Sequence, residues 1–174
     1  RNSTFVADLA RKVGEKLGFS EKECIGLYVG GLLRDIGKIV IPETILSKPK
    51  ELSSSEWDLV KTHPKRGYEE ILQKSDFPWP VGDMVLHHHE RLDGSGYPDG
   101  YSGEDISIEA RIIGVCDVVG AMISERPERS PRTGAEVIGE LEEGKGRLYD
   151  PDVVNAIIDI IENGEVDIEN GSNR

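Results

Sequence analysis

The chain has 174 residues, with 33 acidic against 21 basic side chains and a formal net charge of −12 at pH 7. This length fits one globular domain with a sizeable core. The negative charge argues against a polynucleotide partner, because nucleic-acid binding relies on clustered lysines and arginines. A small phosphate ligand needs only a few local cations, and the candidates are Lys38, Arg111, Arg126, Arg129 and Arg132.

The cysteines and the apolar stretches indicate a cytoplasmic segment. Cys24 and Cys116 lie in apolar runs without the spacing of a zinc site, so we expect two buried small hydrophobic residues. The longest uncharged apolar stretch, 24–33, is too short to span a bilayer, and no signal segment opens the chain. Because residue 1 is Arg and a helical pattern begins at once, we expect a C-terminal piece of a longer protein.

The first half of the chain predicts a series of helices. Apolar residues at four-residue steps predict a helix over roughly 3–17. Ser20 and Glu23 form a capping box for a second helix that runs towards Arg34, with Gly37 as a natural stop. The loop over 42–49 is bracketed by prolines and has room for a short helix at most.

Later helices are indicated by caps and prolines. A capping box at 53–56 begins a helix that ends by His63, since the residue before Pro64 avoids helical geometry, and Pro64 opens the next helix. Pro80 begins another, and 91–106 is a long loop rich in Gly, Pro and Asp. The stretch 110–124 reads as a buried helix, and a last helix runs over 150–162. We expect an all-α domain over 1–164 and a flexible acidic tail over 165–174.

The four histidines are the first candidates for chemistry. His63 lies at a helix end, and His87, His88 and His89 follow one another. Consecutive helical residues fan out by about 100°, so at most two of these three converge on one point. His88 continues the apolar face of its helix, and His89 reaches the same pocket at the loop junction. The alternative is that buried histidines only form hydrogen bonds in the core.

Two aspartates strengthen the case for a metal site. Asp117 falls in the most apolar predicted helix, where an unpaired carboxylate costs several kcal/mol to bury. Asp35 lies near a helix C-terminus. Carboxylates and imidazoles that converge in an all-α core suit Fe, Mn or Zn.

Five stretches of the chain resemble successive blocks of the HD-GYP domain, an all-α branch of the HD metal-dependent phosphohydrolases. They are "RDIGKIVIPETILSKP", "KTHP", "HHERLDGSGYPDG", "EARIIGVCDVV" and "RPER". The resemblance runs from Asn2 to about Ile161. It implies a bundle of about seven to nine helices with a long GYP loop. It also implies hydrolysis of the bacterial second messenger cyclic di-GMP at a centre of two or three metal ions.

The resemblance assigns roles to particular residues. Lys38 matches a lysine that faces the phosphate, where a cation offsets charge on the phosphoryl oxygens, and it is implied in catalysis together with Asp35. Arg126 and Arg129 match a basic pair that holds a nucleotide phosphate, with an ordinary solvated loop as the alternative. The implied metal ligands are Asp35, His63, His88, His89 and Asp117, and the triplet whose loop contacts ligand or partner proteins is Gly96, Tyr97 and Pro98.

The departures from the family pattern fall on the chemistry. The family has histidines where this chain has Arg34 and Asn2, and a further carboxylate would fall before residue 1. Gly120 and Glu128 also replace, respectively, a polar or acidic residue and a tyrosine.

Arg34 is the most severe departure. A guanidinium has no acceptor and stays protonated, so it removes a ligand and adds a positive charge. It either pairs with Asp35 or Asp117 in place of a metal, or points to solvent from the helix end.

Three functions remain open at this stage. The first is an enzyme whose depleted metal centre still hydrolyses cyclic di-GMP or a related phosphodiester. The number of remaining ligands favours reduced or lost hydrolysis. Alternatively, the domain is a catalytically silent receptor for the nucleotide, or an interaction module that contacts a partner through the GYP loop. The third possibility is a structural or dimerisation module without a ligand.

Overall fold

The computed structural model describes residues 2–124 and 130–168, apart from the side chains of residues 72 and 74. This part of the chain is helical and has no strand, so the predicted all-α class is confirmed. The elements in chain order are α1 (Asn2–Lys16), α2 (Glu21–Leu33), the 3-10 helix η1 (Ile36–Val40), α3 (Glu43–Leu46), α4 (Ser54–Val60), α5 (His63–Lys74), α6 (Val81–His87), the 3-10 helix η2 (Gly103–Asp105), α7 (Ile108–Ile123), α8 (Gly134–Gly144) and α9 (Pro151–Glu162).

Local capping explains where several helices begin. The side chains of Ser20 and Ser53 accept from the backbone N–H three residues on, and Glu23 and Glu56 complete both capping boxes. The predicted starts of α2 and α4 are therefore confirmed. Asp150 accepts from two backbone N–H groups at the start of α9, as its position before a proline suggested.

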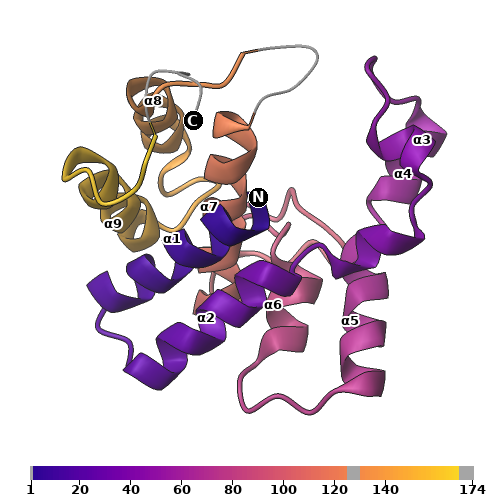
Figure 1. The fold of residues 1–174 in the computed structure, drawn as a ribbon, viewed down its shortest axis with the longest axis horizontal. Helices are drawn as coiled ribbons and strands as arrows, with labels where there is room; N and C mark the ends of the chain where they lie inside the picture. Colours follow the sequence, from indigo (N-terminus) through magenta and orange to yellow (C-terminus); the bar gives the residue numbers. More distant parts are fainter. Residues whose placement is uncertain (1, 125–129, 169–174) are drawn as a thin grey trace.

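The core lies where α1, α2, α6, α7 and α9 meet. Figure 1 shows α1, α2, α6 and α7 gathered in the middle of the molecule, with α8 and α9 on one side and the α3–α4 arm projecting on the other. Both cysteines are buried and free, as predicted. Burial raises the pKa of the Cys116 thiol, which suits a residue that serves as packing. Fully buried members of this core include Leu9, Val13, Ile112, Val119 and Ile157.

One helix has no counterpart among those expected from the sequence. Helix α8 begins with a capping box of Thr133 and Glu136 and buries Val137 and Leu141 against the core. Its few apolar residues alternate with glutamates and glycines, so the helical periodicity of the sequence is too weak to predict this helix. Packing continues past α9 to Ile168, and the predicted boundary at residue 164 stays a prediction.

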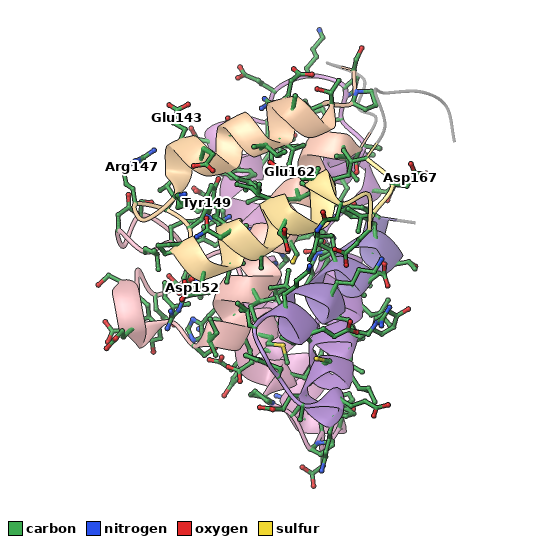
Figure 2. All side chains as sticks on the ribbon, turned by 90° about the vertical axis from the view of Figure 1, so that its left-hand side faces the viewer. Glu143, Arg147, Tyr149, Asp152, Glu162 and Asp167 are labelled. Atoms are coloured by element: carbon green, nitrogen blue, oxygen red, sulfur yellow. The ribbon has the colours of Figure 1, made fainter. Side chains whose placement is uncertain are left out.

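The α8–α9 side of the molecule has a marked excess of acidic over basic side chains. Residues 134–168 contain ten acidic and two basic side chains, whereas residues 36–66 contain four acidic and six basic ones. Figure 2 shows Glu143, Asp152 and Glu162 on the outside of α8 and α9. None of the described helices combines the length and apolar character needed to cross a membrane.

Candidate metal centre

Four predicted ligands converge on one buried point, which we call the histidine pocket: Asp35, His63, His88 and His89. Each offers one ligand atom, and these atoms all lie within 4.8 Å of one another. Asp35 follows α2, His63 begins α5, and His88 and His89 follow α6. Three different parts of the bundle thus supply the pocket.

Backbone carbonyls fix the ring orientation of two of these histidines. His63 Nδ1 donates to the Val60 carbonyl and His88 Nδ1 to the Val85 carbonyl, each at 2.8 Å. In the neutral imidazole, Nε2 then carries the lone pair. These Nε2 atoms lie 3.2 and 3.6 Å from Asp35 Oδ1, so acceptors face one another in the neutral state.

The electrostatics of the histidine pocket suit a cation. Burial, with the nearby His88, His63 and Arg91, holds the pKa of His89 well below its usual range, which leaves a neutral ring. Burial alone would raise the pKa of Asp35, but contacts with His63 and His88 and the charge of Lys38 outweigh it and keep that pKa well below its usual range.

The four facing atoms pass a test for a metal ligand set. Asp35 Oδ1 and the Nε2 atoms of His63, His88 and His89 are buried and have no well-formed hydrogen bond within the described part of the chain. Unpartnered buried polar atoms are costly, and a bound cation would satisfy all four together. Three imidazole nitrogens and one carboxylate oxygen suit Fe, Mn or Zn.

The other half of the site is filled by Arg34, whose side chain is only 1% exposed. Its Nε donates to Asp117 Oδ1 at 2.6 Å, and its Nη2 lies 3.5 Å from Asp35 Oδ2. Its Nη1 donates to the Gly31 carbonyl at 2.8 Å and to Ser3 Oγ at 3.4 Å. Arg34 therefore contacts both carboxylates, and the alternative that it points to solvent is wrong.

Asn2 completes this arrangement. With its amide oriented to satisfy its neighbours, the side-chain oxygen accepts from Arg34 Nη2 at 3.3 Å and the nitrogen donates to the Gly120 carbonyl at 3.2 Å. Each of the three guanidinium nitrogens of Arg34 then has an acceptor. We call Arg34, Asp117, Asn2 and Ser3 the Arg34 cluster. The two positions where the chain lacks the expected histidines thus contact each other.

Asp117 lies between the two halves of the site. Its Oδ1 is held by Arg34, while its Oδ2 lies 4.0 Å from His89 Nε2. The side chain is 16% exposed, so Asp117 is partly buried, where full burial within α7 was expected. One carboxylate oxygen of this predicted metal ligand therefore accepts a hydrogen bond from Arg34.

The GYP loop supports His89. The Tyr97 ring stacks on the His89 ring, with centroids 4.9 Å apart and planes 14° from parallel, and Lys61 Nζ lies 5.3 Å from the centre of the Tyr97 ring. A Cβ on Gly96 would lie 2.2 Å from the His89 carbonyl oxygen, so only glycine fits there. The Tyr97–Pro98 peptide bond is cis. Gly96 and Tyr97 of the predicted triplet thus pack on a metal-ligand candidate.

Gly37 has a different role from the one expected. Helix α2 ends at Leu33, and Gly37 lies within η1 rather than ending a helix. A Cβ on Gly37 would lie 1.9 Å from the His63 carbonyl oxygen. The glycine therefore allows η1 to lie directly on the backbone at the start of α5, which brings Asp35 to His63.

His87 turns away from the histidine pocket, as the 100° step predicts. Its Nδ1 lies 3.0 Å from Glu90 Oε2, and its ring stacks on Tyr101. Glu90 also accepts from the backbone N–H of Asp99 and of Tyr101, and thereby ties the GYP loop to the end of α6. The role of Glu90 was missed from the sequence, because its partners lie nine and eleven residues away in an irregular loop.

The candidate phosphate cations separate into three groups. Lys38 Nζ lies 3.4 Å from Asp35 Oδ2, beside the pocket. Arg111 forms an ion pair with Asp150 at the start of α9, with Nη1 and Oδ2 2.7 Å apart. Arg132 forms one with Glu140 on α8, with Nη1 and Oε2 3.7 Å apart. The predicted pair Arg126 and Arg129, together with Glu128, lies outside the described residues.

Comparison with known proteins identifies the family. The HD domain family matches residues 1–153. The cyclic di-GMP phosphodiesterase response regulator RpfG of Xanthomonas campestris is 42% identical over 154 residues, which cover 88% of this chain and 41% of that protein. A cyclic di-GMP phosphodiesterase of Thermotoga maritima is 39% identical over 160 residues, which cover 91% of this chain and 43% of that protein.

A solved structure shows the same fold. The HDG"Y"P protein from Bdellovibrio bacteriovorus superposes with a TM-score of 0.76 at 22% identity, over 92% of this chain and 51% of that one. A helical bundle with imidazoles and carboxylates at its centre defines an HD-type domain. The chain belongs to the HD domain family, in its HD-GYP branch. It spans about two fifths of the length of the two curated relatives.

Proposed function

We propose that this chain binds one divalent metal ion in the histidine pocket and a cyclic dinucleotide beside it, with hydrolysis reduced or lost. Cyclic di-GMP is the first candidate ligand, because the relatives RpfG and the Thermotoga maritima protein carry it in their names. The observation that carries the proposal is the set of four buried ligand atoms without a well-formed hydrogen bond. Iron, manganese and zinc all suit this ligand set.

The residues around the pocket have defined tasks towards a phosphodiester. A divalent metal bound there would polarise a phosphoryl oxygen and lower the pKa of a water molecule. Lys38 lies next to Asp35 and supplies a positive charge for the phosphoryl oxygens. The carbonyls of Val60 and Val85 keep Nε2 of His63 and His88 directed to the centre of the pocket.

The Arg34 cluster supports the expectation of reduced hydrolysis. Arg34 removes a ligand and holds Asp117 Oδ1, so the ligand atoms needed for a second metal are missing or in use. Its charge also repels a second cation. A guanidinium neutralises the buried carboxylates but cannot generate hydroxide from water.

A metal and ligand titration tests the proposal. The purified chain is reconstituted with Fe(II), Mn(II) or Zn(II), and bound metal is measured by mass spectrometry. We expect about one metal ion per chain, detectable heat on titration with cyclic di-GMP, and slow or absent turnover. The double variant Arg34→His with Asn2→His restores the two family histidines. We expect it to bind more metal and to hydrolyse cyclic di-GMP faster than the parent chain.

The outcomes separate the possible functions. Binding of cyclic di-GMP without any turnover would identify a silent receptor, and the hydrogen bonds from Arg34 to Asp117 and to the Gly31 carbonyl favour this outcome. Rapid turnover by the unaltered chain would contradict the expected loss of hydrolysis. A chain that takes up neither metal nor cyclic di-GMP would leave only a structural or dimerisation role.

A further inference from the structure

A hollow of about 590 Å³ opens beside the histidine pocket, between η1 and α3. We call it the η1–α3 hollow. Asp35 and Lys38 line it, so the hollow and the metal centre share two residues. Its volume lies within the range of small-molecule sites. The remaining lining residues are Ile39, Val40, Ile41, Pro42, Glu43 and Leu46.

The walls of this hollow are apolar and exposed without an evident packing role. The Ile39 side chain is 75% exposed, and Val40 and Leu46 are also exposed. None of the three belongs to the core formed by the described residues. Grouped apolar side chains beside a charged site indicate a surface that is covered when a ligand binds.

The position of the hollow constrains what part of a ligand reaches it. A phosphodiester held by Lys38 and the histidine pocket carries a nucleoside on each side of its phosphorus. The hollow opens next to Asp35 and Lys38, so it lies within reach of one of these two nucleosides.

We propose that the η1–α3 hollow holds a guanine base of the ligand. The inference rests on the proposed function and adds the specificity of the site. The purine ring packs against Ile39, Val40 and Leu46, and Glu43 accepts hydrogen bonds from the base. Guanine presents two neighbouring donors on its Watson–Crick edge, which match the two oxygens of a carboxylate. Adenine presents a donor next to an acceptor, and the acceptor repels a carboxylate.

Matched variants test the apolar wall. Leu46→Asn and Ile39→Asn are compared with Leu32→Asn and Ile25→Asn, which alter exposed residues of the same types on α2. Leu46 and Leu32 are 39% and 40% exposed, so their effects on folding should be similar. In metal-loaded protein, we expect each hollow variant to weaken cyclic di-GMP binding about tenfold, as loss of one buried aliphatic contact predicts. The α2 variants should bind like the parent, and metal content should stay constant in all four.

Glu43→Gln tests the base. We expect it to weaken binding of cyclic di-GMP about tenfold and to leave binding of cyclic di-AMP unchanged or stronger. Equal effects on the two ligands would overturn the assignment of guanine. If the parent binds cyclic di-GMP while the hollow and α2 variants behave alike, the hollow is not the base site and the proposed function stands. If the metal-loaded parent binds no cyclic dinucleotide, both proposals fail.

Discussion

The histidine pocket and the Arg34 cluster meet at two carboxylates, Asp35 and Asp117, and neutralise buried charge in opposite ways. In the pocket, four acceptor atoms face one another without a donor. In the cluster, each nitrogen of one guanidinium has an acceptor. The pocket is thus suited to a cation from solution, whereas the cluster obtains its cation from the chain. The same helical bundle holds both arrangements side by side.

Removing a ligand from the histidine pocket should have the largest effect. In His88→Ala, we expect bound metal to fall from about one ion per chain to near zero. Only three ligands remain in this variant, and the lost imidazole leaves a cavity, so a cation is bound weakly. His87→Ala is the control, since His87 faces Glu90 and should leave metal content unchanged. Equal metal loss in both variants would contradict the assignment of the pocket.

Removing the guanidinium should destabilise the metal-free protein. Arg34→Met leaves Asp117 and Asp35 without their buried cation, and we expect the free energy of unfolding to fall by about 3–5 kcal/mol. Urea denaturation in the presence of a chelator measures it. Arg11→Met, which removes ion pairs with Asp8 and Glu15 near the surface, should cost about 1 kcal/mol or less. Similar losses would mean that the Arg34 cluster contributes no more than an ordinary surface pair.

The smallest effect is expected at the edge of the cluster. Asn2→Ala removes the acceptor for Arg34 Nη2 and the donor to the Gly120 carbonyl, so we expect a loss of about 1–2 kcal/mol in the same assay. Asn155→Ala, which alters an exposed contact with Lys145, should cost less than about 0.5 kcal/mol. An Asn2 variant as stable as the parent would show that Arg34 needs only its two carboxylates and the Gly31 carbonyl.

Sequence reasoning predicted features that depend on neighbouring residues. The capping boxes at Ser20 and Ser53 follow from local geometry, as does the limit of two converging histidines among His87, His88 and His89, and the structure confirms them. Helix α8 was not expected, because its apolar positions are few and its stability comes from packing against the core.

The contacts within the site were less accessible from the sequence. Pairing of Arg34 with a carboxylate was one of two alternatives, and burial of its side chain decides between them. Contacts of Ser3 and Asn2 with Arg34 join residues about 31 positions apart, and no local sequence pattern predicts such contacts. The η1–α3 hollow likewise depends on the path of a short 3-10 segment that periodicity does not resolve.

The close approaches at Gly37 and Gly96 bear on how such a site changes during evolution. Both glycines meet main-chain carbonyl oxygens, those of His63 and His89, so the ligand-bearing backbone is held in place independently of any metal. Under the proposed function, we expect exchange of the side chains at positions 34 and 2 to alter how many ions the centre holds while this backbone stays in place. Gain and loss of a metal would then be separated by two substitutions on an unchanged frame.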